Sequence, residues 1–246
     1  MDKFIIRLIC CFVPSPKKRH MYRKCSIGRY EIIGMNNTIQ FMGCSLPKFL
    51  KIKGLDISIQ GDNNHITIGH PNKSFKDCKF IIRANNATYD IGDVNFMHKA
   101  TIVSAWGNNQ QFYFGDNSDC NELSVFLMEE NTSVVIGKDT IMSTGITIRP
   151  TDIHTIIDIE SEEVINKTKH PVIIGEHCWI SQGVTFLKGA RIPNNTIVGA
   201  QSLVTKEFTT EDTIIAGVPA KQIRKGVRWD LATPFAYSTN KGNLNE

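Results

Sequence analysis

The sequence of 246 residues predicts an all-β fold, a parallel β-helix built from hexapeptide repeats. Three observations predict it: a six-residue hydrophobic period, small residues at a fixed place in each repeat, and asparagine-rich segments spaced about 23 residues apart. No α-helix has a six-residue period, and a simple strand alternates by two. A coil of short strands that turns a corner every six residues satisfies the pattern, because stacked coils pair every strand with its neighbours and bury one apolar column.

The six-residue period is unbroken in the C-terminal half of the chain. The leading apolar residues are Ile174, Ile180, Phe186, Ile192, Val198 and Val204. Four positions after each stand mostly small residues, namely Cys178, Val184, Ala190, Thr196, Ser202 and Phe208. We expect the leading residue to point into the core and the small residue to fit where the backbone bends. Three such segments make one triangular turn.

A longer repeat organises the region upstream. Apolar-glycine pairs recur at Ile68-Gly69, Ile91-Gly92, Phe114-Gly115 and Ile136-Gly137. Asparagines precede them at Asn63-Asn64, Asn85-Asn86, Asn108-Asn109 and Asn131, and Asn36-Asn37 followed by Gly43 is a candidate earlier copy. We interpret these segments as coils enlarged by insertions at the corners, where asparagine tolerates left-handed backbone angles. A β-sandwich with asparagine-rich turns is the alternative.

The period breaks once, between Ile148 and Ile174. The interval holds the run Arg149-Pro-Thr-Asp-Ile-His154 and then a polar stretch. We expect a loop of about residues 149–173 to protrude there, and loops on rigid scaffolds commonly carry function. The expected organisation is a basic amphipathic head at 1–24, a β-helical domain at 25–229 and a C-terminal tail at 230–246.

Charge is concentrated in the head. Seven basic residues stand against Asp2 alone in residues 1–24, which gives +6; since the whole chain carries +4, the remainder carries −2. The domain is therefore not expected to bind nucleic acid. The head alternates apolar residues, from Phe4 to Phe12, with a basic cluster behind them. Two interpretations stay open: an interfacial helix on an anionic membrane leaflet, or a helix packed on the domain with a solvated basic turn.

The remaining composition favours a reducing compartment. The seven cysteines are odd in number and show no Cys-x-x-Cys spacing, so neither a disulfide framework nor a structural zinc site is expected. No apolar run reaches the roughly 20 residues of a membrane span, and Pro14-Ser15-Pro16 follows the first apolar stretch without a signal-peptide cleavage pattern. We expect a cytoplasmic protein, located at the inner face of the bacterial membrane if the head binds lipid.

Three runs carry a family resemblance. They are IRPTDIHTIID, VIIGEHCWISQGVTFLKGARIPNNTIVGAQSLVTK and IIAGVPAKQIRKGVRW, within about residues 134–229. They resemble the hexapeptide-repeat acetyltransferases, and among these the capsular and lipopolysaccharide O-acetyltransferases, including the polysialic acid O-acetyltransferases. Residues 25–133 match the family only in their general repeat pattern. The resemblance implies a left-handed β-helix, a homotrimer with active sites between subunits, acetyl-CoA as donor and no catalytic metal. It implies transfer of acetyl to a sugar hydroxyl of a surface polysaccharide or its precursor.

The resemblance also assigns catalytic roles. His154 stands at the family's catalytic position, and an imidazole, which changes protonation near neutral pH, can accept the proton of the attacking hydroxyl. Asp152 either orients that imidazole or contacts the donor, or it caps a corner turn. Trp179 is expected at an outward corner, where it shapes the acceptor and thioester pocket or stabilises a subunit interface.

The donor positions that match the family are spread over several repeats. They are Gln182, Lys188, Ala200, Thr205, Lys206 and Lys221. Small outward residues let the pantetheine arm lie against the backbone, and lysines meet the phosphates as mobile point charges. Gln182 and Thr205 stand where relatives vary, which leaves the identity of the acceptor open.

Three other functions stay open at the sequence level. One is a small-molecule acetyltransferase that acts on an antibiotic or a free sugar. Another is a β-helical sugar-binding scaffold without catalysis. The third is a γ-class carbonic anhydrase, but the histidines do not show the ligand spacing of that family's zinc site.

Overall fold

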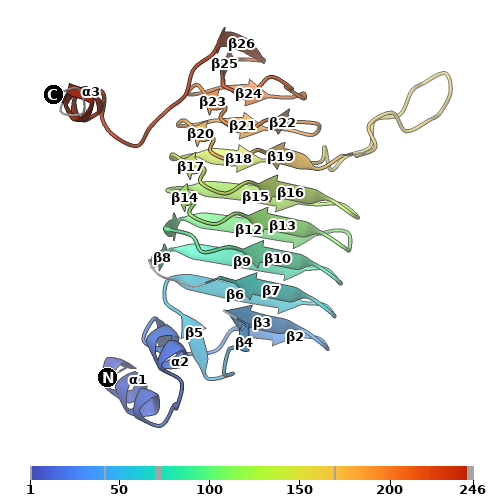
Figure 1. Cartoon of the computed structure of the whole chain (residues 1–246). Helices are drawn as coiled ribbons and strands as arrows, with labels where there is room; N and C mark the ends of the chain where they lie inside the picture. The colour runs from blue at the N-terminus through green and yellow to red at the C-terminus, as the bar shows by residue number, and fades with distance from the viewer. Residues whose placement is uncertain (1, 42, 70–73, 169, 243–246) are drawn as a thin grey trace.

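Three eight-stranded sheets form the sides of a column in the computed structural model, which describes all residues except 1, 42, 70–73, 169 and 243–246. Each strand pairs in parallel with the strands one coil before and one coil after it, except β4 and β26, which pair antiparallel. Figure 1 shows the coils stacked from the N-terminal to the C-terminal end. The predicted parallel β-helix of hexapeptide repeats is confirmed.

The three sheets are named here face 1, face 2 and face 3. Face 1 contains β2 (Glu31–Ile33), β6 (Leu55–Gln60), β9 (Cys78–Arg83), β12 (Ala100–Ala105), β15 (Leu123–Leu127), β18 (Ile146–Ile148), β21 (Thr185–Phe186) and β24 (Leu203–Val204). Face 2 contains β3 (Thr38–Phe41), β4 (Cys44–Ser45), β7 (His65–Ile68), β10 (Thr88–Ile91), β13 (Gln111–Phe114), β16 (Ser133–Ile136), β19 (Val172–Ile174) and β22 (Arg191–Ile192). Face 3 contains β8 (Ser74–Lys76), β11 (Phe96–His98), β14 (Asp119–Cys120), β17 (Ile141–Met142), β20 (Trp179–Ile180), β23 (Ile197–Val198), β25 (Thr213–Gly217) and β26 (Ala220–Lys225).

The upstream coils differ from the prediction in where they hold their extra residues. Strands β6, β9 and β12 have six residues each, whereas β21 and β24 on the same face have two. The extra residues therefore mainly lengthen the strands on faces 1 and 2, and the corners between them stay short. Longer strands are stable here because every added residue finds a register partner in the next coil.

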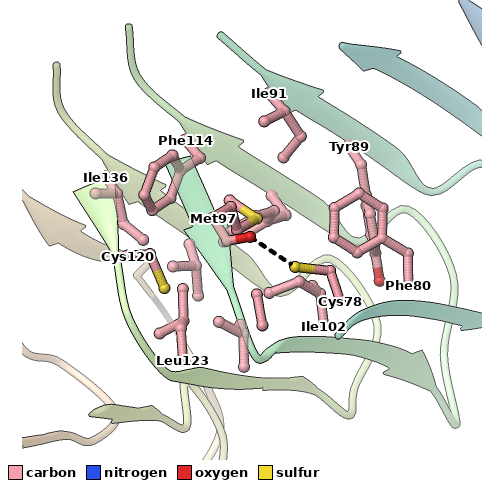
Figure 2. Close-up of a cluster of buried hydrophobic side chains, with 14 of the residues drawn as sticks. Cys78, Phe80, Tyr89, Ile91, Met97, Ile102, Phe114, Cys120, Leu123 and Ile136 are labelled. Carbon is pink, nitrogen blue, oxygen red and sulfur yellow. Dashed lines mark hydrogen bonds between the residues drawn. The ribbon is translucent and has the colours of Figure 1, made fainter. Parts of the chain in front are cut away.

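The interior of the column is apolar along its length. All six leading residues of the downstream period are at most 2% exposed, as the period predicts. In the middle coils, Figure 2 shows aromatic and aliphatic side chains from all three faces in one cluster. Phe80 packs edge-to-face on Tyr89 with ring centroids 5.5 Å apart, and the Cys78 thiol donates to the Met97 carbonyl at 3.1 Å. Each buried side chain of this size contributes about 1.5–3 kcal/mol.

Asparagine and glycine build the corners between faces 1 and 2 and those after face 2. Asn86, Asn109 and Asn131 have φ values of 57°, 59° and 56°, which confirms the predicted left-handed angles. Their side chains form a ladder: Asn86 Nδ2 donates to Asn109 Oδ1 at 3.1 Å, and Asn109 Nδ2 donates to Asn131 Oδ1 at 3.0 Å. At the next corner, a Cβ on Gly115 would lie 2.4 Å from the backbone nitrogen of Lys138, so only glycine permits the coils to approach.

The N-terminal head contains two helices where one was expected, α1 (Asp2–Cys11) and α2 (Pro16–Tyr22). They precede β1 (Cys25–Ile27), which pairs antiparallel with β5 (Leu50–Ile52) below the first coil. Helix α1 packs against the domain through Ile6 and Cys10, each 3% exposed. Within the described residues no helix is both long and apolar enough to cross a membrane.

The C-terminal end is closed by a hairpin. Strand β25 adds to face 3, and β26 pairs with it antiparallel. The chain then returns along face 3 and ends in α3 (Pro234–Gly242), which stands apart from the column in Figure 1.

Candidate active site

A long loop leaves the column between β18 and β19, at the corner where face 1 meets face 2. Its two legs run side by side, because Ile157 bridges Val164 in antiparallel register and Ile165 N donates to the Ile156 carbonyl at 3.0 Å. The Asp158 carboxylate accepts hydrogen bonds from the backbone of the turn, including Ser161 N at 2.9 Å, and these bonds lower the pKa of Asp158. Figure 1 shows the loop projecting well beyond all other corners.

His154 lies at the base of this loop with its side chain exposed. Its backbone N–H donates to the Asp152 carbonyl at 2.7 Å, and its own carbonyl accepts from Asn166 Nδ2 at 2.8 Å. The residue before it, Ile153, has φ +67°, which is unfavourable for a β-branched side chain. Such strain persists only where neighbouring contacts fix the backbone, and it is common at functional sites.

Glu129, on the corner of the preceding coil, ties both legs of the loop to the column. One carboxylate oxygen accepts the hydroxyl of Thr151, and the other accepts the hydroxyl of Thr168 at 3.1 Å. Thr151 Oγ1 in turn accepts the backbone N–H of Ile153 at 3.0 Å. Hydrogen bonds to a charged acceptor are stronger than neutral ones, so this contact set holds the strained turn before His154 in place.

Asp152 is occupied by a second set of contacts. Its Oδ2 atom forms an ion pair with Lys188 Nζ and accepts from Asn166 Nδ2 at 3.1 Å. Lys188 Nζ also donates to the Asn166 carbonyl at 2.9 Å. Among the residues that the structure describes, no hydrogen bond joins this carboxylate to the His154 ring. The Asp152 carboxylate thus contacts Lys188 and Asn166, and Lys188, expected to contact the donor, here contacts the loop.

Trp179 lies on a different side of the column. It belongs to β20 on face 3, opposite the corner that carries the loop, and it points outward from a strand instead of from a corner as expected. Trp179 is 41% exposed, and its ring lies 6.5 Å from that of Trp229 in the returning chain. Trp229 stacks on His177 at 4.5 Å and donates its indole N–H to the His177 carbonyl at 2.8 Å.

The positions expected to bind the donor divide between two corners and the last strand of face 3. Lys188, Thr205 and Lys206 follow β21 and β24 and share the corner of His154. Gln182 and Ala200 follow β20 and β23, at the corner between faces 3 and 1, and Lys221 lies exposed on β26 at the end of face 3. One chain thus brings His154, Asp152 and three donor positions to one corner and leaves the others on the far side.

An exposed tryptophan occurs on the same corner as the loop, two coils nearer the N-terminus. Trp106 is 72% exposed and has φ +56°. Arg83 and Ala105 are register partners, yet Asn86 follows Arg83 by three residues while Asn109 follows Ala105 by four. Trp106 is therefore an extra residue in its coil, displayed to solvent on a backbone conformation that bulky residues rarely adopt.

Glu129, Asn166, Trp106 and Trp229 were not identified as site residues from the sequence. Trp229 ends the third run that carries the resemblance, which was a usable signal. Glu129 contacts residues 22 and 39 positions away, and no local pattern encodes such contacts. In the described part of the chain, no group of three or more His, Cys, Asp or Glu side chains has an arrangement that could hold a metal ion.

Known relatives match most of the chain, although no protein-family model matches it. The polysialic acid O-acetyltransferase of Neisseria meningitidis is 31% identical over 222 residues, which cover 88% of this chain and 96% of that protein. WbbJ of Escherichia coli K12, provisionally assigned as a lipopolysaccharide biosynthesis O-acetyl transferase, is 32% identical over 61% of this chain and 81% of its own.

Solved structures agree with these relatives. The polysialic acid O-acetyltransferase OatWY superposes with a TM-score of 0.62 and 25% identity, over 89% of this chain and 99% of its own. NeuO, a polysialic acid specific acetyltransferase, superposes with a TM-score of 0.55 over 87% of this chain and 97% of its own; at 18% identity it supports the fold alone. With a column of hexapeptide coils, a protruding loop and 31% identity to an O-acetyltransferase over 88% of its length, the chain belongs to the hexapeptide-repeat O-acetyltransferases.

Proposed function

We propose that this protein transfers acetyl from acetyl-CoA to a hydroxyl group of a surface polysaccharide or its precursor, with His154 as general base. The observation that carries the proposal is the position of His154: an exposed imidazole on a strained turn that Glu129, Lys188 and Asn166 hold against the column. The relatives' names support the class of acceptor.

The reaction needs one proton acceptor and one new ester bond. His154 accepts the proton of the acceptor hydroxyl as that oxygen attacks the thioester carbonyl. The new C–O bond forms, the C–S bond breaks, and the imidazolium returns its proton to the CoA sulfur. A positioned general base of this kind accelerates a reaction by about 10²–10⁴-fold. The turn at Ile153 serves this step because it fixes the direction in which the imidazole points.

The described residues fit an acidic, extended donor. Lys206 lies exposed on the corner of His154, with its ammonium 5.5 Å from the centre of the Phe208 ring, and it can meet a phosphate. On the other corner, Ala200 is exposed and follows Gly199, so a pantetheine arm can lie close to the backbone there. Lys221 adds a further exposed cation on β26.

The division of these positions between two corners supports a site shared by two subunits of a homotrimer. The loop carries aliphatic side chains that the described residues leave exposed, namely Ile156, Ile157, Ile159, Val164 and Ile165, with Ile159 94% exposed. Burial of such a group against a neighbouring copy is favourable. In this arrangement the His154 corner of one subunit faces Trp179, Gln182 and Ala200 of the next.

The acceptor would approach along the His154 corner. Trp106 presents its ring to solvent on that corner, and a flat aromatic surface suits stacking against the apolar face of a sugar ring. The spacing of two coils corresponds to about 10 Å, so an oligosaccharide can contact Trp106 while one of its hydroxyls reaches His154. This reach favours an extended saccharide over a small acceptor.

The test compares wild type with His154→Ala, using acetyl-CoA and a panel of bacterial polysaccharides and oligosaccharides. We expect acetylated product from the wild type and a loss of about 10²–10⁴-fold in kcat for the variant. Product is measured by mass spectrometry, because the exposed Cys11 thiol would add to a colorimetric assay of released CoA. The matched control is His65→Ala, an exposed histidine on β7. If His154→Ala keeps wild-type kcat, or if no acceptor yields product, the proposal is wrong.

A further inference from the structure

The outer face of α1 carries large apolar side chains in solvent. Phe4, Leu8 and Phe12 are 73%, 52% and 80% exposed. Phe4 and Leu8 lie on one side of the helix, and Phe12, directly after its last residue, continues the same four-residue spacing. Ile6 and Cys10 on the other side are buried against the domain. The helix is thus held in place by one face and presents a second apolar face that no described part of the chain covers.

Cationic side chains surround this helix. A cavity of about 420 Å³ between α1 and α2 is lined by Arg7, Cys10, Cys11, Arg19 and Arg23. A second cavity of about 230 Å³ shares Arg7 and Arg23 and adds Lys3, Ile6 and Lys53. Among the side chains that the structure describes, no carboxylate lines either cavity. Guanidinium groups that converge on one cavity suit a phosphate, which they can bind in a bidentate manner.

Arg19 is held in a fixed position. Its guanidinium donates to the carbonyl oxygens of Val13 and Pro14, at 2.5 Å and 3.1 Å, in the link between the helices. Helix α2 begins at Pro16 after Ser15, whose hydroxyl accepts Lys18 N at 3.4 Å. The first of the two cavities is therefore built by the local fold of the head.

The head lies at the N-terminal end of the column (Figure 1). A flat surface can approach that end without meeting the loop, which leaves the column several coils away. The positive net charge of the chain is concentrated at the same end, since the head carries +6 and the rest −2. We propose that the head docks the protein on an anionic phospholipid membrane, with Phe4, Leu8 and Phe12 at the level of the acyl chains and Arg7, Arg19 and Arg23 on lipid phosphates.

The test measures binding of the full chain to sedimented vesicles. Vesicles of phosphatidylcholine with about 30 mol% phosphatidylglycerol are compared with pure phosphatidylcholine at about physiological ionic strength. We expect binding to the anionic vesicles, a marked loss in about 1 M salt, and a loss of about thirtyfold on Arg7→Gln with Arg23→Gln. Phe4→Ser with Phe12→Ser is expected to weaken binding at least about tenfold.

Two controls match these variants at the other end of the molecule. Phe235→Ser alters an 83% exposed phenylalanine of α3, and Arg224→Gln with Lys225→Gln removes two exposed cations of β26. Both are expected to bind vesicles like the wild type. Because the head residues take no part in the proposed catalysis, their variants should acetylate a soluble acceptor normally, so failure of membrane docking and failure of the proposed activity can be told apart.

Four outcomes would overturn the proposal. The first is no binding to anionic vesicles, and the second is equal binding to neutral ones. In the third, the wild type self-associates without vesicles and Phe4→Ser with Phe12→Ser abolishes that association, which would mean that a second copy covers the face. In the fourth, millimolar inorganic phosphate competes fully with vesicles, so the cavities would select free phosphate and not a lipid surface.

Discussion

Glu129 contacts the base of the loop that carries His154, although the two residues lie far apart in the sequence. It accepts the hydroxyls of Thr151 and Thr168 and so fixes both legs of the loop. Glu129→Ala leaves the largely buried Thr151 hydroxyl without this acceptor, which costs about 1–3 kcal/mol of unfolding free energy. It also frees the turn that orients the imidazole.

We therefore expect Glu129→Ala to lower kcat more than it raises KM for the acceptor, as measured by steady-state kinetics with chemical denaturation in parallel. Glu130, the next residue, accepts Asn108 N at 3.1 Å and forms no hydrogen bond with the described residues of the loop, so Glu130→Ala serves as the matched control. A Glu129→Ala enzyme that is destabilised but has unchanged kcat would show that the carboxylate supports the fold only.

Two buried thiols make the free energy of unfolding depend on pH in the alkaline range. Burial raises the pKa of Cys25 and of Cys178 from 9.0 to about 12. Below pH 9 both thiols are protonated in the folded and unfolded states. Between about pH 9 and 12 the unfolded chain loses these protons first, so the free energy of unfolding falls as pH rises, by at most about 1.4 kcal/mol per pH unit for each thiol.

Urea denaturation at pH 8.0 and pH 10.5 measures this dependence. We expect Cys178→Ala to lower stability at both pH values but to reduce the difference between them. Cys11→Ser, which alters an exposed thiol, should leave the difference unchanged. An identical pH dependence in wild type and Cys178→Ala would contradict the assignment.

At the scale of the elements, the corners set how closely the coils stack. A Cβ at Gly115 would lie 2.4 Å from Lys138 N and 2.7 Å from the Gly137 carbonyl carbon. Both atoms belong to the backbone and cannot turn aside. Gly115→Ala is therefore expected to lower the unfolding free energy by about 1–3 kcal/mol, measured by thermal and urea denaturation.

The control for this change is Gly28→Ala. There the new Cβ would meet only the flexible side chain of Lys51, at 3.1 Å or more, so a smaller effect is expected. Equal losses in both variants would mean that the loss at Gly115 does not come from close contact between coils.

The strands and the loop show which features of the fold the sequence could predict. The six-residue period predicted the leading core residues from Ile174 to Val204, since each strand repeats the same local geometry. It predicted the loop as a break in that geometry. The longer upstream repeat predicted extra residues at the corners, whereas the structure has most of them in longer strands. An insertion in a corner and an extension of a strand add the same number of residues, so the spacing cannot tell them apart. The contacts of Asp152 with Lys188, and of Trp179 with Trp229, depend on how coils stack, and no local pattern encodes them.

At the scale of the whole molecule, a shared active site makes a specific prediction. If His154 comes from one subunit and Trp179 from its neighbour, inactive His154→Ala and Trp179→Ala chains should complement each other when coexpressed. Purification through two different affinity tags retains only mixed trimers, and in a mixed trimer about one site in three has both native residues. We expect about that fraction of wild-type activity in the mixture, measured after purification through two different affinity tags.

The same experiment carries its own control. Each variant expressed alone should form an assembly of wild-type mass and show little activity. If the coexpressed mixture is no more active than the single variants, the two residues do not act in one shared site.

The regular stacking of the column fixes a length. Face 1 places five steps between β2, in the first coil, and β18, which leads into the loop. At about 4.8 Å a step this is about 24 Å. A column standing upright on the membrane-bound head would hold the reacting hydroxyl this distance beyond the first coil, out of reach of sugars nearer the lipid. Inserting or deleting one 23-residue coil would change that distance by one step of about 4.8 Å. The acetylated positions along the polysaccharide would shift accordingly.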